Sequence, residues 1–323
     1  MSARIAAVGA GRMGRGIALA FAYAGYEVDV IDLKQRGGAA WAQLEREARE
    51  EMAASLATLA DLGAMPADAV ERVLARIRLV PESGAGPALG SADAVFEAVT
   101  ETLDVKRDAF ARTCALARAD AILASTTSTI LVTDLVPLVT HAERLVNAHW
   151  LNPAYVIPLV ELSAHPGTSA EVVARLRLLL EDIGKVPVVC GATPGYIVPR
   201  LQALVMNEAA RMVEEGVAPE EIDKATRYGL GLRFAALGVV EFIDYGGNDI
   251  LYYASRYLAE RVSRERYAPP AIVERLMHEG RIGLKSGEGF YDYRGRDVAA
   301  YRKDALARVL GVLRHAGLYR PPR

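Results

Sequence analysis

One histidine in the middle of the chain stands where proton-transfer chemistry could be carried out. His149 ends a predicted buried strand that begins at Leu145, and it is followed by Asn152-Pro153 and by Glu161. An enzyme that oxidises an alcohol needs a base with a pKa near about 7, and histidine is the side chain suited to that task. Taken alone, His149 would by default be interpreted as a core histidine hydrogen-bonded at a strand end.

A second motif, at the N-terminus, predicts binding of a dinucleotide. Gly9-Ala10-Gly11-Arg12-Met13-Gly14 follows the apolar run Ile5 to Val8 and opens a helix, and Asp32 ends the next strand. In this arrangement Gly9 permits the tight turn, Gly11 lets the backbone approach a pyrophosphate, and Gly14 lets the helix pack closely on the strand.

Asp32 also indicates which dinucleotide is bound. It lies 32 − 14 = 18 residues past the last glycine of the motif, near the roughly 20 residues typical of the acidic group that binds the adenosine ribose. A carboxylate there repels a 2′-phosphate, so we expect NAD rather than NADP. Lys34 and Arg36 could soften that exclusion. The alternative is a strand-to-helix turn with an exposed Asp32.

The chain resembles the L-3-hydroxyacyl-CoA dehydrogenase family. The resemblance extends from the glycine motif through Phe96-Glu97-Ala98-Val99-Thr100-Glu101 to Gly287-Glu288-Gly289-Phe290-Tyr291, about 290 residues. It implies that His149 is the catalytic acid and base, within an H-x-x-N-P motif, and that Glu161, 12 residues later, orients it.

The same resemblance implies further site residues. Ser128, 21 residues before the histidine, matches a family hydroxyl that bonds the substrate oxygen, and Glu101 and Lys106 match an E-x-x-x-x-K pattern beside the nicotinamide ribose. Two alternatives stand beside these roles. Ser128 could cap the helix that follows it, and Lys106 could be a solvated helix charge.

Two positions depart from the family pattern. Thr126 and Pro199 stand where the family usually has Asn, and the second of these Asn side chains normally helps to hold the substrate. Proline is compatible with the first turn of a helix, so we expect the fold to be unaffected. Asn207 could compensate, although an Asn on a helix more often faces solvent or a neighbour.

The residues that would select the substrate point in two directions. Arg233 and the segment that begins at Asn152 resemble the branch of the family that includes λ-crystallin and carnitine dehydrogenase, and a guanidinium is a natural partner for a carboxylate. Arg233 could instead be a structural ion-pair partner. The Gly287 to Tyr291 segment resembles short-chain hydroxybutyryl-CoA dehydrogenases.

We therefore predict NAD-dependent oxidation of a short-chain L-3-hydroxyacyl-CoA, an activity of fatty-acid metabolism. Asn152 and Arg233 are candidate substrate contacts. The alternatives are a dehydrogenase of a free 3-hydroxy acid, resembling the gulonate and carnitine enzymes, and a non-catalytic NAD-binding protein.

The elements that position these residues form two domains. Residues 1–192 are expected to form a Rossmann-type α/β domain that binds NAD, with a helical hairpin inserted over Trp41 to Arg76, because short β-branched runs alternate with helical stretches as in a parallel sheet. Residues 193–323 lack such runs and predict an all-helical domain, for which the family resemblance implies a role in substrate binding and dimerisation. The predicted strands are Ile5–Val8, Glu27–Ile31, Ile77–Val80, Ala94–Ala98, Ala121–Ser125, Leu145–His149, Leu159–Leu162 and Val186–Cys190.

Composition narrows the classes of partner. The 323 residues carry 38 basic and 40 acidic side chains, without the basic excess that nucleic-acid binding needs. The basic residues are 32 Arg and only 6 Lys, and no Lys lies between Lys34 and Lys106. Because acyl-CoA members of the family carry a CoA-contacting Lys in the helical hairpin, this gap favours a free acid, although an Arg could replace it.

The hydropathy pattern, the cysteines and the family resemblance lead to expectations about location and assembly. No apolar run is long enough to span a membrane, so we expect a cytoplasmic protein with a small-molecule substrate. Cys114 and Cys190 suggest buried hydrophobic residues rather than a disulfide or a metal site. The family resemblance implies a homodimer.

Overall fold

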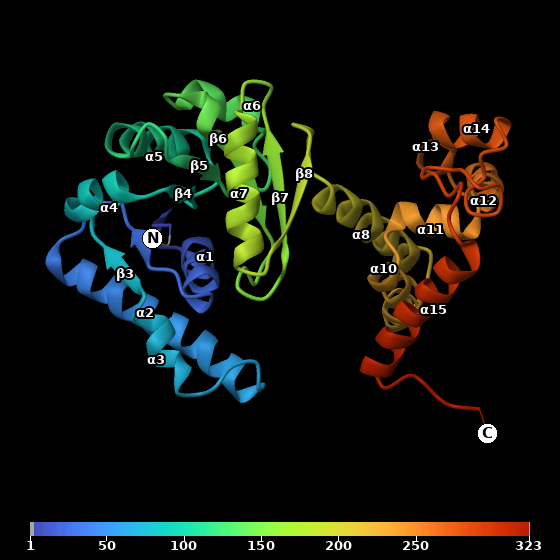
Figure 1. Ribbon diagram of the computed structural model, residues 1–323, viewed down its shortest axis with the longest axis horizontal. Helices are drawn as coiled ribbons and strands as arrows, with labels where there is room; N and C mark the ends of the chain where they lie inside the picture. Colours follow the sequence, from blue (N-terminus) through green and yellow to red (C-terminus); the bar gives the residue numbers. More distant parts are fainter. Residues whose placement is uncertain (1–2, 323) are drawn as a thin grey trace. The chain divides into compact units, whose positions relative to one another are not determined.

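A computed structural model describes residues 3–322, and its first part is built on a single eight-stranded sheet (Figure 1). The strand order is β3-β2-β1-β4-β5-β6-β7-β8. All eight predicted strands are present, each with bounds within two residues of the prediction. They are β1 Ile5–Val8, β2 Val28–Ile31, β3 Ile77–Val80, β4 Ala94–Glu97, β5 Ile122–Ser125, β6 Leu145–Trp150, β7 Leu159–Ala164 and β8 Val186–Cys190.

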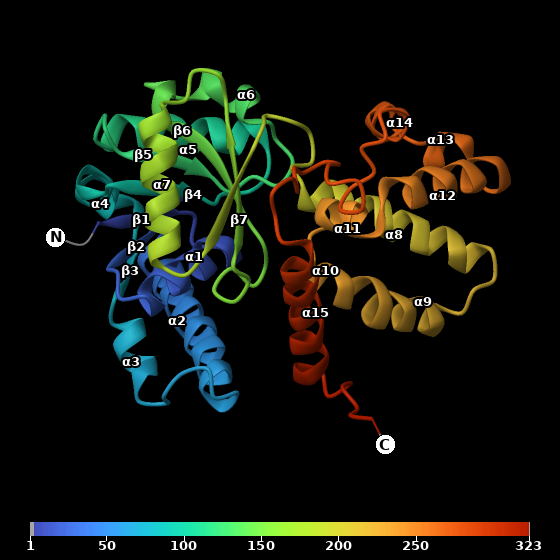
Figure 2. The ribbon, with the colours of Figure 1, turned by 45° about the vertical axis from the view of Figure 1, so that its right-hand side comes forward.

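Helices cover both faces of this sheet, which is why most residues of its central strands are apolar. One core packs α1, α2, α3 and α7 on the sheet, and a second core packs α4, α5 and α6 on the opposite face. The pair α2 and α3 confirms the predicted helical hairpin (Figure 2). The bounds are α1 Arg12–Tyr23, α2 Gly38–Asp61, α3 Ala69–Leu74, α4 Ala85–Ser91, α5 Leu103–Leu116, α6 Val132–Leu135 and α7 Ala170–Asp182.

The sheet departs from the predicted all-parallel arrangement at one place. Strands β6 and β7 pair antiparallel, whereas the other neighbours pair parallel. The physical reason is the length of the connection: only eight residues separate Trp150 from Leu159, and a parallel crossover needs about a dozen or more. The two strands therefore form a hairpin.

The second compact unit begins at Met206, within α8, and the first ends at Val205. Within the described residues this second unit is helical, as predicted, apart from isolated bridges between residues 283 and 292. The helices from α8 onward are α8 Val198–Glu214, α9 Pro219–Ala225, α10 Leu232–Ala236, α11 Val239–Gly246, α12 Asn248–Arg261, α13 Arg264–Tyr267, α14 Ala271–His278 and α15 Val298–His315.

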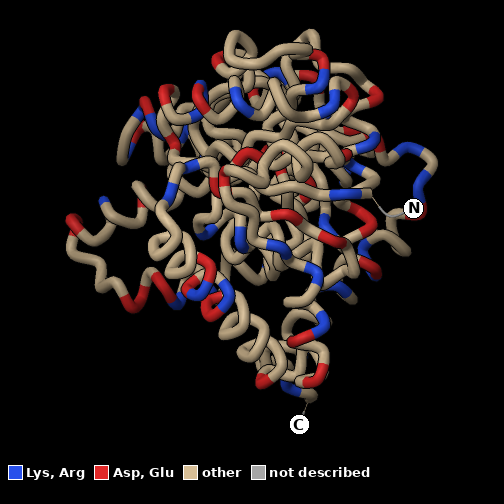
Figure 3. Tube along the Cα trace, turned by 90° about the vertical axis from the view of Figure 1, so that its left-hand side faces the viewer, with Lys and Arg blue, Asp and Glu red and all other residues tan. Residues whose placement is uncertain are grey.

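Charged residues of both signs are interspersed along the trace rather than gathered by sign (Figure 3). No helix in residues 3–322 combines the length and the apolar character needed to cross a bilayer. Both cysteines are partly exposed, so the expectation that they are buried was wrong. The side chain of Cys190 faces the carbonyl of Leu162 on the neighbouring strand, and Cys114 packs at the margin of the second core.

Candidate active site

The glycine motif has the close contacts that a dinucleotide loop requires. Gly9 has φ +113°, and a Cβ there would lie 2.5 Å from the carbonyl oxygen of Ala98. A Cβ on Gly14 would lie 1.9 Å from the oxygen of Gly9, so only glycine lets α1 approach β1. A Cβ on Gly11 would meet nothing within 4 Å, which leaves open space above the loop. Helix α1 begins at Arg12, so Arg12 and Met13 lie in its first turn.

Asp32 directly follows β2, near the glycine loop. The alternative prediction of an exposed Asp32 was wrong. The residue is 5% exposed. One carboxylate oxygen accepts a hydrogen bond from the backbone N–H of Lys34, and the other is ion-paired with Arg36. A pocket of about 770 Å³ lies beside Asp32 and includes Gly9 and Gly11 in its lining. Its size, its acidic end and the open glycine loop fit NAD.

Glu101 and Lys106 belong to a buried network of charges. Lys106 is 0% exposed, so the alternative of a solvated helix charge was wrong. Its ammonium donates to both oxygens of Glu97 at 2.9 Å and lies 3.2 Å from Glu101. Glu97 also accepts a hydrogen bond from Ser125 at 2.6 Å. Glu97 was missed at the sequence level, although an acidic residue inside a buried strand is itself a signal.

The Glu101 carboxylate organises the turn that carries Ser128. It accepts hydrogen bonds from the hydroxyl of Thr127 and from the backbone N–H groups of Ser128 (2.9 Å) and Thr129 (3.2 Å). Partial burial alone would raise the pKa of Glu101, but the Thr127 hydrogen bond and the Lys106 charge outweigh it and lower that pKa. Glu101 is therefore held as a carboxylate.

Ser128 itself is exposed on this turn. The next helix, α6, begins at Val132 and its N-cap residue is Leu131, so the alternative that Ser128 caps that helix was wrong. Thr126, which stands where the family usually has Asn, is buried immediately after β5. The turn thus exposes the hydroxyl of Ser128 while its backbone is fixed by Glu101.

His149 and Glu161 face each other across the β6–β7 hairpin. They are directly paired in the strand register, and side chains directly opposite in an antiparallel pair lie on the same face of the sheet. His149 Nδ1 lies 2.9 Å from Glu161 Oε2, with His149 4% and Glu161 0% exposed. The hairpin is therefore the structural cause of the 12-residue spacing.

The second oxygen of Glu161 is held by the start of α8. Glu161 Oε1 accepts hydrogen bonds from the backbone N–H groups of Ile197 (2.9 Å) and Val198 (2.8 Å). Both oxygens of Glu161 are therefore fixed in position, one by His149 and the other by the backbone. Pro199 follows these two donors, where the lack of an N–H removes nothing from the site.

Tyr196 and Asn147 complete this cluster, and the sequence analysis missed both. The rings of Tyr196 and His149 are stacked, with centroids 4.9 Å apart and planes 12° from parallel. Asn147 donates a hydrogen bond to the Tyr196 oxygen at 3.0 Å. A signal was present for Asn147, because residues two apart on a strand share a face. The stacking of Tyr196 on His149 joins residues 47 apart in the sequence, so no local pattern predicts it.

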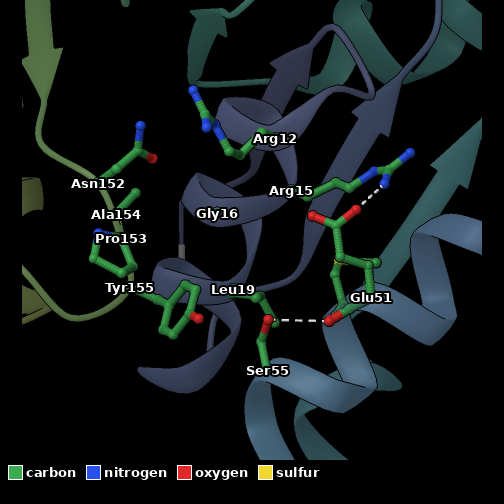
Figure 4. Close-up of a pocket in the computed structure, with 11 residues that line it drawn as sticks. Arg12, Arg15, Gly16, Leu19, Glu51, Ser55, Asn152, Pro153, Ala154 and Tyr155 are labelled. Atoms are coloured by element: carbon green, nitrogen blue, oxygen red, sulfur yellow. Dashed lines mark hydrogen bonds and ion pairs between the residues drawn. The ribbon is translucent and has the colours of Figure 1, made fainter.

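Asn152 and Arg12 lie at a second pocket of about 320 Å³ beside α1 (Figure 4). The ion pair of Arg15 with Glu51 of α2 crosses its wall. The loop that carries Asn152 is fixed by Lys185, whose ammonium donates to the carbonyls of Ala154 (2.7 Å) and Ile157 (2.9 Å). Burial lowers the pKa of Lys185.

Arg233 lies in the second unit, on α10, and is exposed. Its Nε donates to the carbonyl of Gly229 at 2.9 Å, and its guanidinium lies 5.0 Å from the ring centre of Phe242. No ion pair of Arg233 is found within residues 3–322. Asn207, the other residue considered for the substrate, is exposed on α8.

The Gly287 to Tyr291 motif has a structural role in the second unit. Asp244, which is 0% exposed, accepts hydrogen bonds from the backbone N–H groups of Phe290 (3.0 Å) and Tyr291 (2.8 Å). A Cβ on Gly289 would lie 2.2 Å from the Asp244 carboxylate. The Gly287 to Tyr291 motif therefore stabilises the fold of the helical unit, and its presence does not identify the substrate.

The chain is similar to known proteins over nearly its whole length. It matches the 3-hydroxyacyl-CoA dehydrogenase NAD-binding domain over residues 4–193 and the C-terminal domain of that family over residues 195–293. It is 32% identical over 317 residues to 5-formyl-3-hydroxy-2-methylpyridine 4-carboxylate 5-dehydrogenase of Mesorhizobium japonicum, covering 97% of this chain and 98% of that one.

Two further similarities come from a curated relative and a solved structure. The chain is 35% identical to the 3-hydroxyadipyl-CoA dehydrogenase of Escherichia coli, covering 94% of this chain but only 62% of that longer protein. The crystal structure of a 3-hydroxyacyl-CoA dehydrogenase from Archaeoglobus fulgidus matches with a TM-score of 0.78 and 32% identity, covering 98% of this chain and all of that one. The chain belongs to the 3-hydroxyacyl-CoA dehydrogenase family of NAD-dependent oxidoreductases.

Proposed function

We propose that this protein oxidises the 3-hydroxyl group of a short-chain L-3-hydroxyacyl-CoA to the 3-keto compound. The observation that carries the proposal is the buried His149–Glu161 pair, whose Nδ1 to Oε2 distance is 2.9 Å. Because Glu161 engages Nδ1, the other ring nitrogen is the one that can exchange a proton with a substrate hydroxyl.

Each residue of the site has a defined task in this reaction. Bound NAD would supply the two-electron acceptor for the hydride that leaves C3. His149 removes the hydroxyl proton, and Glu161 stabilises the imidazolium that results. The exposed hydroxyl of Ser128 donates a hydrogen bond to the substrate oxygen as it becomes a carbonyl. In the reverse direction, His149 returns the proton.

The groups that would hold the cofactor lie in and around the larger pocket, whose lining includes Gly9, Gly11 and Asp32. Gly9, Gly11 and Gly14 would let the backbone approach the pyrophosphate, and Arg12 and Met13 lie in the first turn of the helix that follows. Asp32 would bind the adenosine ribose. Glu101 and Lys106 act on the nicotinamide side through the turn that they organise, because the Lys106 ammonium is fully occupied by carboxylates.

Asn152 and the smaller pocket beside it are proposed to hold the part of the substrate that does not react. Arg12 and Asn152 present polar groups there, and Ser55 lies on the opposite wall (Figure 4). A pocket with cationic and hydrogen-bonding groups suits a polar, anionic extension of an acyl group. In keeping with the family, we also propose a homodimer and a cytoplasmic location.

A substrate panel tests the proposed function. Purified protein is mixed with NAD and with L-3-hydroxybutyryl-CoA, its D-isomer, free L-3-hydroxybutyrate, L-gulonate and L-carnitine, and NADH absorbance is followed. We expect kcat/KM to be highest for the L-thioester. Tight NAD binding without turnover of any member of the panel would overturn the proposal and favour the non-catalytic reading.

A second candidate function is supported by a specific observation in the helical unit. The guanidinium of Arg233 is stacked on Phe242 and bonded through Nε alone among its nitrogens, as far as the described residues show. Its outer N–H groups can thus bind a carboxylate in bidentate fashion. The Mesorhizobium japonicum relative, which is named for a pyridine carboxylate, matches nearly the full length of both chains. A free 3-hydroxy acid is therefore the alternative substrate.

A further inference from the structure

Tyr196 lies in the turn between β8 and α8 and contacts the segments that carry the reacting groups. Its ring stacks on the imidazole of His149 with centroids 4.9 Å apart. Its hydroxyl donates a hydrogen bond to the carbonyl of Thr127 at 2.8 Å, and Thr127 immediately precedes Ser128. One side chain therefore touches both the proposed base and the turn that presents the substrate's hydrogen-bond donor.

The backbone at Tyr196 is in a conformation that side chains rarely adopt. Its φ is +45°, next to Gly195 at +79°. A non-glycine residue in this left-handed region persists only where its surroundings enforce it. Here the conformation turns the ring toward His149, while the next two N–H groups, those of Ile197 and Val198, point at Glu161 Oε1. The strained residue thus serves both members of the proton-transfer pair.

Hydrogen bonding fixes the direction of the Tyr196 hydroxyl. Asn147 donates through its Nδ2 to the Ile130 carbonyl at 3.0 Å, which determines how the amide is oriented, and the same Nδ2 donates to the Tyr196 oxygen at 3.0 Å. The tyrosine proton is therefore left for Thr127. Tyr196 is 6% exposed, and burial raises the pKa of its hydroxyl, so this donor stays protonated.

We propose that Tyr196 is a positioning residue for the proton-transfer step. Its ring fixes the plane of His149, so that Nδ1 stays on Glu161 and the other ring nitrogen stays directed at the substrate. Its hydroxyl fixes the turn that presents Ser128. Tyr196 acts through these two residues without touching the substrate. The proposal rests on the assignment of His149 as the acid and base.

Two substitutions separate the ring from the hydroxyl. Tyr196→Phe keeps the stack and loses two hydrogen bonds, so we expect kcat to fall by about 3- to 10-fold, and Tyr196→Leu also frees the imidazole, so we expect about 30-fold or more. The affinity for NADH, measured by fluorescence, should change by less than about 2-fold in both. Tyr26→Phe is the matched control, because it removes a tyrosine–aspartate hydrogen bond elsewhere in the same unit, and it should leave kcat unchanged.

A double-mutant cycle shows whether Tyr196 acts through His149. In a His149→Gln background, adding Tyr196→Leu should change the residual rate by less than about 2-fold, because residues that act as one unit are not additive. An equal fractional loss in both backgrounds would contradict the proposal. So would a folded Tyr196→Leu protein whose kcat stays within about 3-fold of the native value.

A readout without substrate keeps this test separate from the proposed function. In protein labelled with ¹⁵N-histidine, the His149 resonances are assigned by their loss in His149→Gln. We expect the Nδ1–H signal to be sharp in the native protein and in Tyr196→Phe, and broadened by exchange with water in Tyr196→Leu. A sharp signal in all three would overturn the positioning role, even if no substrate in the panel were turned over. If the native signal is sharp and only the panel fails, the function alone is wrong.

Discussion

The surroundings of His149 and of Arg233 differ in how completely each charged or polar group is held. His149 is buried, stacked on Tyr196 and bonded to Glu161, which is itself bonded to two backbone amides. Arg233 is exposed and held by one carbonyl and one aromatic face. The first arrangement leaves one ring nitrogen free, whereas the second leaves the outer edge of a guanidinium free.

This contrast separates the chemistry from the choice of substrate. Proton transfer requires atoms held to within a fraction of an ångström, which a buried cluster of hydrogen-bonded and stacked side chains provides. Selection of a carboxylate or a thioester requires only a group that is available when the substrate arrives. Substitutions around His149 should therefore change kcat, and those around Arg233 should change KM for particular substrates.

Removal of the base gives the largest expected effect. His149→Gln retains hydrogen bonding but cannot act as a base, so we expect kcat to fall by at least about 100-fold. NAD affinity should persist, because the glycine loop and Asp32 are untouched. Steady-state rates and isothermal titration with NADH measure the two quantities, and His315→Gln, on an exposed helix end, is the control. Retention of more than about a tenth of kcat would exclude His149 as the acid and base.

The next largest effect is expected at the partner of the base. Glu161→Gln still accepts the two backbone N–H groups with its oxygen, which turns its amide nitrogen toward His149 and forces the ring into the wrong tautomer. We expect kcat to fall by about 30-fold or more with KM nearly unchanged. Glu171→Gln, at the exposed start of α7, is the matched control. If Glu161→Gln raised KM and left kcat unchanged, Glu161 would be a substrate-binding residue and not the partner of the base.

Asp32 is intermediate between the two regions, since it is buried but paired with the half-exposed Arg36. Asp32→Ala removes the ribose contact and frees that guanidinium, so we expect KM for NAD to rise about 10-fold and NADP to become a usable cofactor. KM values for both cofactors measure the change. The double variant Asp32→Ala, Arg36→Ala should lose the gain in NADP use. If the double variant still uses NADP, the 2′-phosphate is bound by Lys34 or another group and not by Arg36.

The sequence was sufficient for the elements and insufficient for the contacts that join them. Strands, hairpin helices and the glycine loop follow local rules of periodicity and turn chemistry, and all were found at their predicted places. The antiparallel β6–β7 pair was missed because buried strands read alike in either direction. That hairpin is the same feature that explains the spacing of His149 and Glu161.

The contacts that could not be predicted are those between distant segments. Tyr196 meets His149 and Thr127 only because β8 lies next to β7. Lys106 was placed at the nicotinamide side by resemblance, yet its burial against Glu97 depends on α5 packing over β4. Side-chain partners of this kind are set by tertiary packing, which local patterns do not encode.

The smallest expected effect decides between the two substrates and completes the comparison. If Arg233 binds a carboxylate, Arg233→Ala should raise KM for a free hydroxy acid by about 5-fold or more, with kcat unchanged because the His149 cluster is intact. KM for L-3-hydroxybutyryl-CoA should not change. Arg233→Lys keeps the charge but not the bidentate geometry, so it should recover only part of the loss. Equal KM values in the native protein and in both variants would show that Arg233 has only a structural role, through its contacts with Gly229 and Phe242. A fall in kcat would instead show that Arg233 contributes to the chemical step, and it would contradict the separation of chemistry from substrate choice.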